Sequence, residues 1–361
     1  MAVMQLINQE HFNDIHLADL FFDTLKADYP AFEIWYTGKC DKADSVAYTF
    51  RNPVTAALDG FLYLKQEHGT VTDVQPPLLT ARRLKLGTFK VNPHGTRLGE
   101  RFIKRAFDVA VAARVQALYV TVFAKHAALV ELFLRYGFIH VSNKSGPTGN
   151  ELVLERRLDA IKNDVVLDYP RIPLKVNRHF VLSIYPIWHS RLLPDSLLNT
   201  ESANILEDVS HTNSIHKIYL TSMQGVDKLT RGDTLLIYRT APSGTAAYFT
   251  SVVTSLCVVE GLVHISSFKS EEEFVNYCSA YSVFTESELV DFFRKKKYPW
   301  LIRFTYNMSL TKRPNRKTLL EEVRIPSDIY WGFFQIGTEQ LKHILKLSGD
   351  YEKARSLVYT S

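Results

Sequence analysis

The residues whose types and spacing best suit chemistry lie between an apolar run that ends at Val91 and a helical pattern that begins near residue 96. The first amides of a helix have no acceptor within it and point outward at the positive end of the helix dipole, so a diphosphate is a natural ligand there. Glycine lets such a ligand approach the backbone closely. The residues expected to form this site are His94, Gly95, Thr96, Arg97, Leu98, Gly99 and Glu100, with Arg101 as a further cation. An ordinary strand–helix connection would show much of the same pattern.

A second group of candidates follows about twenty residues later. Residues 117–123 are β-branched and apolar, which predicts a buried strand, and residues 125–136 have helical spacing closed by Gly137. Tyr119, His126 and Tyr136 lie on these two segments and carry groups that can hold or transfer a proton. Each of the three is also a residue type that packs or faces solvent without any chemical role.

The order strand, turn, helix, strand, helix resembles the GNAT superfamily of N-acetyltransferases over residues 1–158. The coenzyme-loop motif of that family falls on residues 94–99, where Gly99 matches, while His94 and Arg97 replace a Gln or Arg and a Gly. The pair Gly137 and Phe138 matches the end of the family's next helix.

The resemblance implies acetyl-coenzyme A as the cofactor. The pantetheine arm would then pair with the backbone of Phe89, Lys90 and Val91, and an exposed amide there would polarise the thioester carbonyl. Many family members use a tyrosine as general acid where this chain has Phe133. Tyr136, His126 and Tyr119 are therefore the candidates for proton transfer, and no general base is identified.

The predicted elements give an α/β (α+β) fold class with an N-terminal mixed sheet flanked by helices. Strands are expected at 45–51, 58–66, 83–91, 117–123 and 151–158, and helices at 12–26, 96–114 and 125–136. The domain prediction is an acyltransferase domain at 1–158, a linker or irregular extension at 159–213, and a second domain at 214–361. The prolines of the middle segment favour the extension.

The second domain reads as short strands at 215–221, 234–239, 247–259 and 300–307, with helices at 271–278, 285–295 and 338–347. Residues 217–239 and 326–336 resemble the PUA-like group that includes EVE and ASCH domains. The resemblance implies a small β-barrel with helical insertions, and a role in binding RNA.

Residues 292–320 contain no acidic residue and combine basic with aromatic side chains, as a surface that binds phosphates and bases does. A solvated helix end followed by a core strand would look similar. The candidates for contact with nucleic acid are Lys295, Lys296, Lys297, Trp300, Arg303, Lys312, Arg313, Arg316, Lys317 and Trp331.

Bulk properties set the remaining limits. The 361 residues suggest two domains, and 46% hydrophobic with 22% charged residues is ordinary for a globular protein. No apolar run of about 18 residues is present, so no contact with a membrane is expected. The three scattered cysteines favour a cytoplasmic location over disulfides or a metal site.

The sequence therefore predicts an acetyl-CoA-dependent N-acetyltransferase that acts on a primary amine. The second domain suggests that this amine belongs to an RNA-linked substrate, such as tRNA or aminoacyl-tRNA. Two alternatives stay open: an RNA-binding regulator that senses acyl-CoA with little or no catalysis, and a protein N-acetyltransferase. The oligomeric state stays open too.

Overall fold

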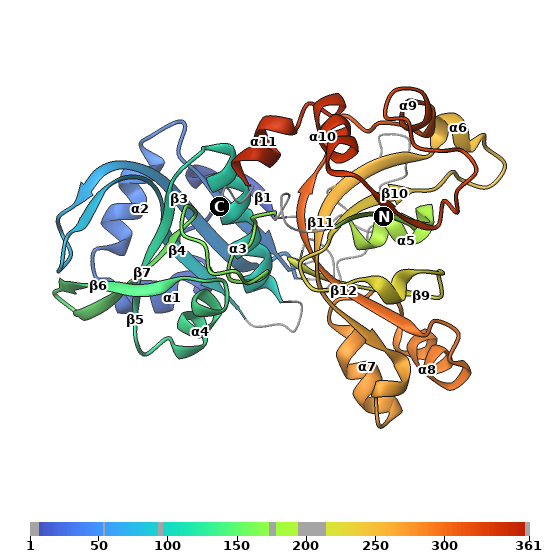
Figure 1. Ribbon diagram of the computed structural model, residues 1–361. Helices are drawn as coiled ribbons and strands as arrows, with labels where there is room; N and C mark the ends of the chain where they lie inside the picture. Colours follow the sequence, from blue (N-terminus) through green and yellow to red (C-terminus); the bar gives the residue numbers. More distant parts are fainter. Residues whose placement is uncertain (1–6, 53–54, 93–96, 173–177, 194–213, 358–361) are drawn as a thin grey trace. The chain divides into compact units, whose positions relative to one another are not determined.

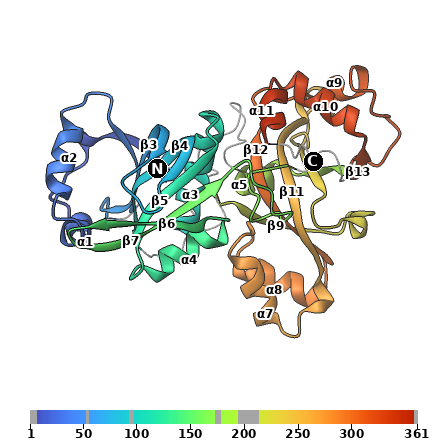
Figure 2. The same ribbon diagram turned by 60° about the vertical axis from the view of Figure 1, so that its left-hand side comes forward.

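A computed structural model describes residues 7–52, 55–92, 97–172, 178–193 and 214–357. The chain divides into two compact units, Met1–Ala160 and Ile161–Ser361, each built on its own sheet (Figures 1 and 2). The mixed α/β class expected from the sequence is confirmed.

The first unit holds a seven-stranded mixed sheet in the order β1-β2-β3-β4-β5-β7-β6. Among its described pairs only β4 and β5 run parallel. The crossover through α3 returns the chain to the end of the sheet at which β4 began, so β5 runs in the same direction. The strands are β1 (Asn8–His11), β2 (Val46–Arg51), β3 (Leu58–Val71), β4 (Leu78–Val91), β5 (Ala117–Phe123), β6 (Ile139–Gly146) and β7 (Gly149–Arg157).

Helices cover both faces of this sheet; they are α1 (Asp23–Asp28), α2 (Phe32–Cys40), α3 (Leu98–Ala112) and α4 (Ala127–Arg135). Phe89 of β4 contacts Phe102 of α3 and Phe133 of α4, so these two helices share one face. Phe61 of β3 contacts Phe12 and Phe22, which belong to the cluster under α1 and α2 on the opposite face.

The helix predicted at 12–26 is wrong. The structure replaces it by two 3₁₀ turns, Phe12–Asp14 and Leu20–Phe22, and the short α1, and it adds α2, which the sequence reading missed. Asp19 explains the break: its side chain accepts a hydrogen bond from the Phe21 amide, which starts a new turn inside the apolar pattern.

The second unit holds a six-stranded mixed sheet in the order β13-β8-β10-β11-β12-β9, in which only β10 and β8 run parallel among the described pairs. The strands are β8 (His179–Ile184), β9 (His216–Thr221), β10 (Thr234–Arg239), β11 (Val252–His264), β12 (Trp300–Ser309) and β13 (Phe333–Ile336). No described pairing joins β13 to β9, so closure into a barrel stays a prediction.

Helices and turns surround this second sheet: α5 (Pro186–Leu192), α6 (Ala247–Thr250), α7 (Glu271–Ser279), α8 (Glu286–Lys295), α9 (Arg316–Glu321), α10 (Thr338–Leu347) and α11 (Tyr351–Ser356), with 3₁₀ turns at Val226–Lys228 and Ile265–Ser267. Thr285 and Glu288 form a capping box that begins α8. None of the described helices has the length and apolar character needed to cross a membrane.

The segment predicted as a linker or extension, 159–213, contains a core element. β8 lies between β10 and β13, and all six of its residues are buried. A strand buried on both faces shows a continuous apolar run without alternation, which is why Phe180–Ile184 gave no strand signal between the flanking prolines.

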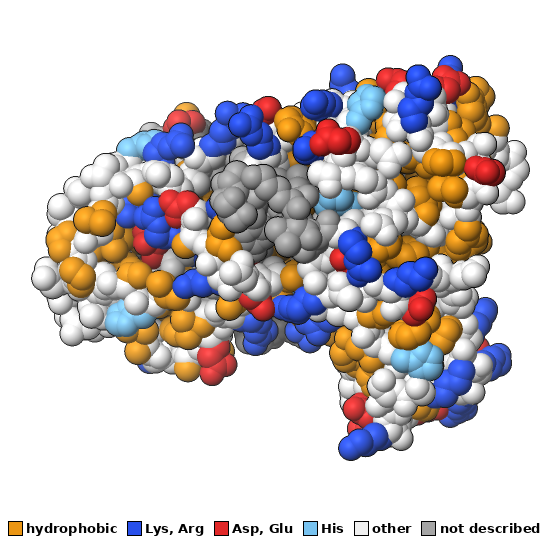
Figure 3. Space-filling model, viewed as in Figure 1, with side chains coloured by type: hydrophobic (Ala, Val, Ile, Leu, Met, Phe, Trp, Pro, Cys, Tyr) orange, Lys and Arg blue, Asp and Glu red, His pale blue; other side chains and the backbone are white. Residues whose placement is uncertain are grey.

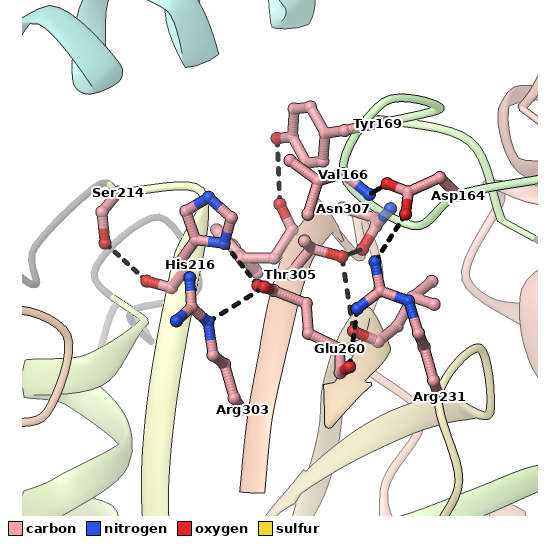
Figure 4. A network of polar contacts seen from close by, with 12 residues as sticks. Asp164, Val166, Tyr169, Ser214, His216, Arg231, Glu260, Arg303, Thr305 and Asn307 are labelled. Carbon is pink, nitrogen blue, oxygen red and sulfur yellow. Dashed lines mark hydrogen bonds and ion pairs between the residues drawn. The ribbon is translucent and has the colours of Figure 1, made fainter. Parts of the chain in front are cut away.

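Residues 161–172 are also attached to the second sheet, across β11 and β12 (Figure 4). Arg231 joins Asp164 at 2.8 Å and the Glu260 carbonyl at 2.8 Å. The Tyr169 hydroxyl donates to the Tyr306 carbonyl at 3.0 Å, and the Asn307 amide donates to two carbonyls at 170 and 171. Residues 161–172 therefore belong to the fold of the second unit.

Candidate functional site

The first unit contains a place where two parallel strands part. β4 and β5 are paired from Arg83 opposite Ala117 to Leu86 opposite Val120, and the pairing then stops. β4 continues to Val91 on β3, while β5 continues to Phe123 on β7. The β4 backbone beyond Leu86 thus has no partner strand on its β5 side among the described residues.

A bulge at Gly87 starts this separation. Tyr63 is opposite Thr88 while Leu64 is opposite Leu86, so Gly87 is the extra residue on β4. A Cβ at Gly87 would lie 2.9 Å from Cδ1 of the Tyr63 ring. The position therefore requires glycine, and the bulge bends β4 away from β5.

A pocket of about 890 Å³ occupies the gap between the two strands. That volume lies within the range of small-molecule and cofactor sites. Its walls are β4 from Leu86 to Val91, β5 from Val120 to Val122, the start of α3, the first half of α4, and residues of α1 and α2 that include Trp35.

The predicted cofactor residues divide into three groups. Phe89, Lys90, Val91, Arg97, Leu98 and Gly99 line the pocket. Glu100 and Arg101 are buried instead, and the Arg101 guanidinium lies 5.0 Å from the centre of the Phe50 ring. His94, Gly95 and Thr96 lie outside the described residues.

The start of α3 supplies donors at one end of the pocket. Arg97 is the N-cap in a left-handed conformation (φ 54°), and the first hydrogen bond of the helix is donated by the Glu100 amide to the Arg97 carbonyl. The amides of Leu98 and Gly99 precede that bond, and both residues line the pocket. A helix start of this kind can hold a phosphate group.

A charged cluster joins α1 to the start of α4 on another wall. Asp28 accepts hydrogen bonds from Lys125 at 2.5 Å and from Nε2 of His126 at 2.8 Å, and all three residues line the pocket. Burial acts to raise the pKa of Asp28, but the bonds from Lys125 and His126 outweigh it and hold the pKa below its ordinary value. The carboxylate thus stays charged and orients the imidazole.

The neighbouring Tyr29, at the end of α1, connects this helix to the sheet. Its hydroxyl donates to Glu151 of β7 at 2.8 Å, and its ring packs 5.2 Å from Phe123. Burial, and then the carboxylate of Glu151, raise the pKa of Tyr29, so this hydroxyl keeps its proton. Sequence reading missed Asp28, Tyr29 and Glu151, because their partners lie more than 90 residues away in the chain and only the fold brings them together.

The other two predicted proton-transfer residues lie elsewhere. Tyr136 caps the far end of α4, is fully buried, and is not among the described lining residues. Tyr119 is buried on β5 and its hydroxyl donates to Glu67 of β3. His126 is therefore the one predicted proton-transfer residue that lines the large pocket.

In the second unit, the predicted basic surface is split in two. Lys295 ends α8 and Lys296 and Lys297 follow it, whereas Lys312, Arg313, Arg316 and Lys317 follow β12. Ten residues of β12 separate these groups by about 30 Å at roughly 3.3 Å per residue. Arg303, between them, is ion-paired with Glu260 at 2.9 Å. Figure 3 shows Lys and Arg side chains over α7 and α8.

Aromatic side chains accompany the first of these groups. Lys297 lies 5.2 Å from the centre of the Tyr298 ring, and Tyr185 and Tyr330 are 63% and 55% exposed. Burial raises the pKa of Tyr219, with smaller contributions from Tyr298, Tyr185 and Tyr330. Trp300 is half-buried against His264, while Trp331 lies against Arg316 of the second group.

No group of three or more metal-ligating side chains occurs among the described residues.

The sequence matches no protein-family model and no curated protein. Solved structures resemble parts of it. They include an ASCH protein from Zymomonas mobilis (12% identity, 47% of this chain and 94% of that one, TM-score 0.31) and an IAA acetyltransferase from Bacillus cereus (14%, 42% and 99%, 0.31). A GNAT family acetyltransferase from Elizabethkingia anophelis, solved with acetyl-CoA bound, is a third (11%, 42% and 97%, 0.29). Likenesses at such scores assign no function.

Proposed function

We propose that the first unit is an acyltransferase that uses acetyl-coenzyme A and an amine acceptor. One observation carries the proposal: β4 and β5 part after Leu86 and Val120, and the 890 Å³ pocket lies in their gap and reaches the start of α3. An extended arm with amide groups fits beside the free edge of β4, as an added strand would. The diphosphate then meets the amides of Leu98 and Gly99.

The reaction is direct transfer. The amine nitrogen attacks the thioester carbon, a β4 amide between Phe89 and Val91 stabilises the oxyanion, and coenzyme A leaves as a thiol. His126, oriented by Asp28, carries the proton to or from the reacting groups. Tyr136 acts in packing, since it is buried outside the pocket wall.

Acetyl-CoA binding, measured by isothermal titration calorimetry, tests the proposed site. Ala128 is exposed and lines the pocket, so Ala128→Trp should fill it and weaken binding at least 10-fold without disturbing the core. Ala124→Trp is the matched control, because Ala124 is exposed in the preceding turn and is not a described lining residue. Equal binding by both variants would contradict the proposed site.

A second candidate is a coenzyme sensor with little catalysis. Phe133 favours it, because the chain has no hydroxyl at the position where the resemblance expects a general acid. A single-turnover assay with labelled acetyl-CoA separates the two: an enzyme moves the label to an amine, and a sensor releases acetyl-CoA unchanged.

We also propose that the second unit brings the acceptor as an RNA-linked amine. The contact of Lys297 with the Tyr298 ring and the exposed rings of Tyr185 and Tyr330 support this, because rings free to stack and nearby cations suit a single-stranded nucleic acid. Fluorescence anisotropy with labelled tRNA should show binding that weakens steeply with salt and weakens further in Tyr330→Ala. Binding that neither salt nor this variant alters would count against it.

A further inference from the structure

Two lysines belong to the described lining of the 890 Å³ pocket, and their surroundings differ. Lys125, just before α4, is ion-paired with Asp28 at 2.5 Å, and its side chain is 59% exposed. Lys90, on β4, is half-buried, and no carboxylate of the described residues is ion-paired with it. Its ammonium donates to two neutral oxygens, the Phe21 carbonyl and, at 2.5 Å, the Thr24 hydroxyl. Lys90 is therefore the pocket amine that is not fixed by a counter-charge.

Lys90 lies at the end of the pocket that faces α1 and α2. Phe89, the residue before it, contacts Phe102 of α3 and Phe133 of α4 on the opposite face of the sheet. Successive side chains of a strand alternate between the two faces, and the Lys90 nitrogen lies 4.6 Å from the centre of the Phe21 ring. The pocket has walls on both faces, so a coenzyme with its diphosphate at the start of α3 reaches the α1 side with its acyl end.

The strand segment around Lys90 is also the one that the proposed function gives to the thioester. A carbonyl oxygen that accepts from an amide between Phe89 and Val91 lies about 2.9 Å from that nitrogen. An extended lysine side chain spans about 6 Å from Cα to Nζ, at roughly 1.5 Å per bond, and its four-carbon stem is flexible. The Lys90 amine can therefore leave Thr24 and reach the acyl carbon without any movement of the backbone.

Burial also favours the reactive form of this amine. It lowers the pKa of Lys90 below its ordinary value. The nearby carboxylates oppose this shift without cancelling it; they belong to Asp23, Asp19 and Asp28. An amine attacks only after it has lost its extra proton, and that loss costs less here than for a lysine in water. Because the amine and the thioester share one pocket, their reaction is effectively unimolecular.

We propose that Lys90 is a self-acetylation site, at which the chain transfers an acetyl group from its own bound acetyl-CoA to the Lys90 amine. The proposal rests on the acyltransferase function given above. The ammonium gives one proton to water, and its nitrogen then attacks the acyl carbon. A C–N bond forms as the C–S bond breaks, and a second proton passes from the nitrogen to the sulfur, so coenzyme A leaves as a thiol. The product is an amide that does not pass its acetyl group on, so each chain takes up one acetyl group and keeps it.

Mass spectrometry of the full-length protein, incubated with acetyl-CoA and no acceptor, tests the site. The intact mass should rise by one acetyl group per chain, and peptide mapping should find that group on Lys90, with at least 10-fold less on Lys125. Chemical acetylation from solution would give the reverse order, because Lys125 is the more exposed of the two pocket lysines. Labelling of Lys125 that equals or exceeds that of Lys90 overturns the proposal.

A variant without this amine gives the second test. Lys90→Arg keeps the positive charge but cannot form the amide, so its intact mass should not change. Lys39→Arg is the matched control: Lys39 also donates to a neutral hydroxyl, that of Tyr63 at 2.5 Å, and lies over an aromatic ring, but it is not among the described lining residues. It should take up the acetyl group as the wild type does. An acetylated Lys90→Arg chain, or a rate per chain that rises with protein concentration, overturns transfer within one chain to Lys90.

Self-acetylation and the proposed function fail differently. Ala128→Trp, which fills the coenzyme pocket, should lower the acetylation of Lys90 at least 10-fold together with acetyl-CoA binding. If calorimetry shows that the wild type binds acetyl-CoA while Lys90 stays unmodified, self-acetylation is overturned and the coenzyme site stands. If the wild type binds no acetyl-CoA at all, the proposed function itself is overturned.

Discussion

Phe133 stands where the sequence resemblance leads one to expect a tyrosine as general acid, and its side chain is fully buried between Phe89 and Phe138. A phenyl ring there can only pack, so proton transfer must come from another residue of the pocket wall. Under the proposed function His126 is that residue, because Asp28 orients its ring and both line the pocket. The proposed site would thus use a histidine–carboxylate pair in place of one hydroxyl.

His126→Ala should therefore lower kcat about 100-fold, the lower end of the contribution that general acid–base groups make, with acetyl-CoA affinity unchanged. Tyr136→Phe should leave kcat within about 2-fold, because Tyr136 is not at the pocket wall and the ring is kept. Steady-state kinetics with a labelled acceptor measure both. A larger loss in Tyr136→Phe than in His126→Ala would reverse the assignment.

In the second unit, Glu260 carries a buried charge whose pairing contributes to stability. It is bonded to His216 and to Arg303, and its side chain is 5% exposed. Burial acts to raise the pKa of Glu260, but His216 and Arg303 outweigh it and the pKa is lowered from 4.5. The pairing therefore stabilises the fold fully above pH 4.5, and this contribution is lost as the pH falls below that value.

Glu260→Gln should lower the free energy of unfolding by about 3–5 kcal/mol at pH 7, the cost of removing one partner from a buried ion pair. The difference from the wild type should shrink below pH 4.5. Urea denaturation at pH 7 and pH 4 measures it. Glu271→Gln, which breaks the exposed pair with Arg294, should change nothing measurable.

At the scale of elements, α3 can serve the coenzyme only if it lies close to β3. Gly60 makes this possible: a Cβ there would lie 2.4 Å from Cε2 of Phe102, and a buried ring cannot yield. α3 would have to move away from the sheet, together with the amides of Leu98 and Gly99 at its start.

Gly60→Ala should therefore cost about 1–3 kcal/mol of stability, as overpacking does, and should weaken acetyl-CoA binding as well. Gly38→Ala is the control in the same unit, because nothing lies within 4 Å of its Cβ and alanine favours the helix by up to about 1 kcal/mol. Thermal denaturation and calorimetry measure both effects. Unchanged affinity in Gly60→Ala would show that the position of α3 does not set the site.

The elements that sequence reading placed well are those with strong local signals. β5 was predicted with its bounds, and α3 and α4 within two residues, because their periodic patterns end in turns or at Gly137. β8 was missed because a fully buried strand has no alternation. The partners Asp28, Tyr29 and Glu151 were missed because only the fold brings the end of α1 to the start of α4 and to β7.

At the scale of the whole molecule, each unit has its own sheet and its own buried core, and the proposed ligand binds the first unit alone. Two units of this kind should unfold in two cooperative transitions. A ligand raises the stability only of the folded unit that binds it, by about 2.7 kcal/mol at 100 times its dissociation constant.

Differential scanning calorimetry of the full chain should then show that acetyl-CoA raises the Tm of one transition and that Glu260→Gln lowers the Tm of the other. The two changes should add when combined, because sites without shared partners act independently. A single transition that both changes shift would mean that the chain unfolds as one cooperative body. Acetyl-CoA that shifts the same transition as Glu260→Gln, with the other unmoved, would place the coenzyme in the second unit and overturn the site between β4 and β5.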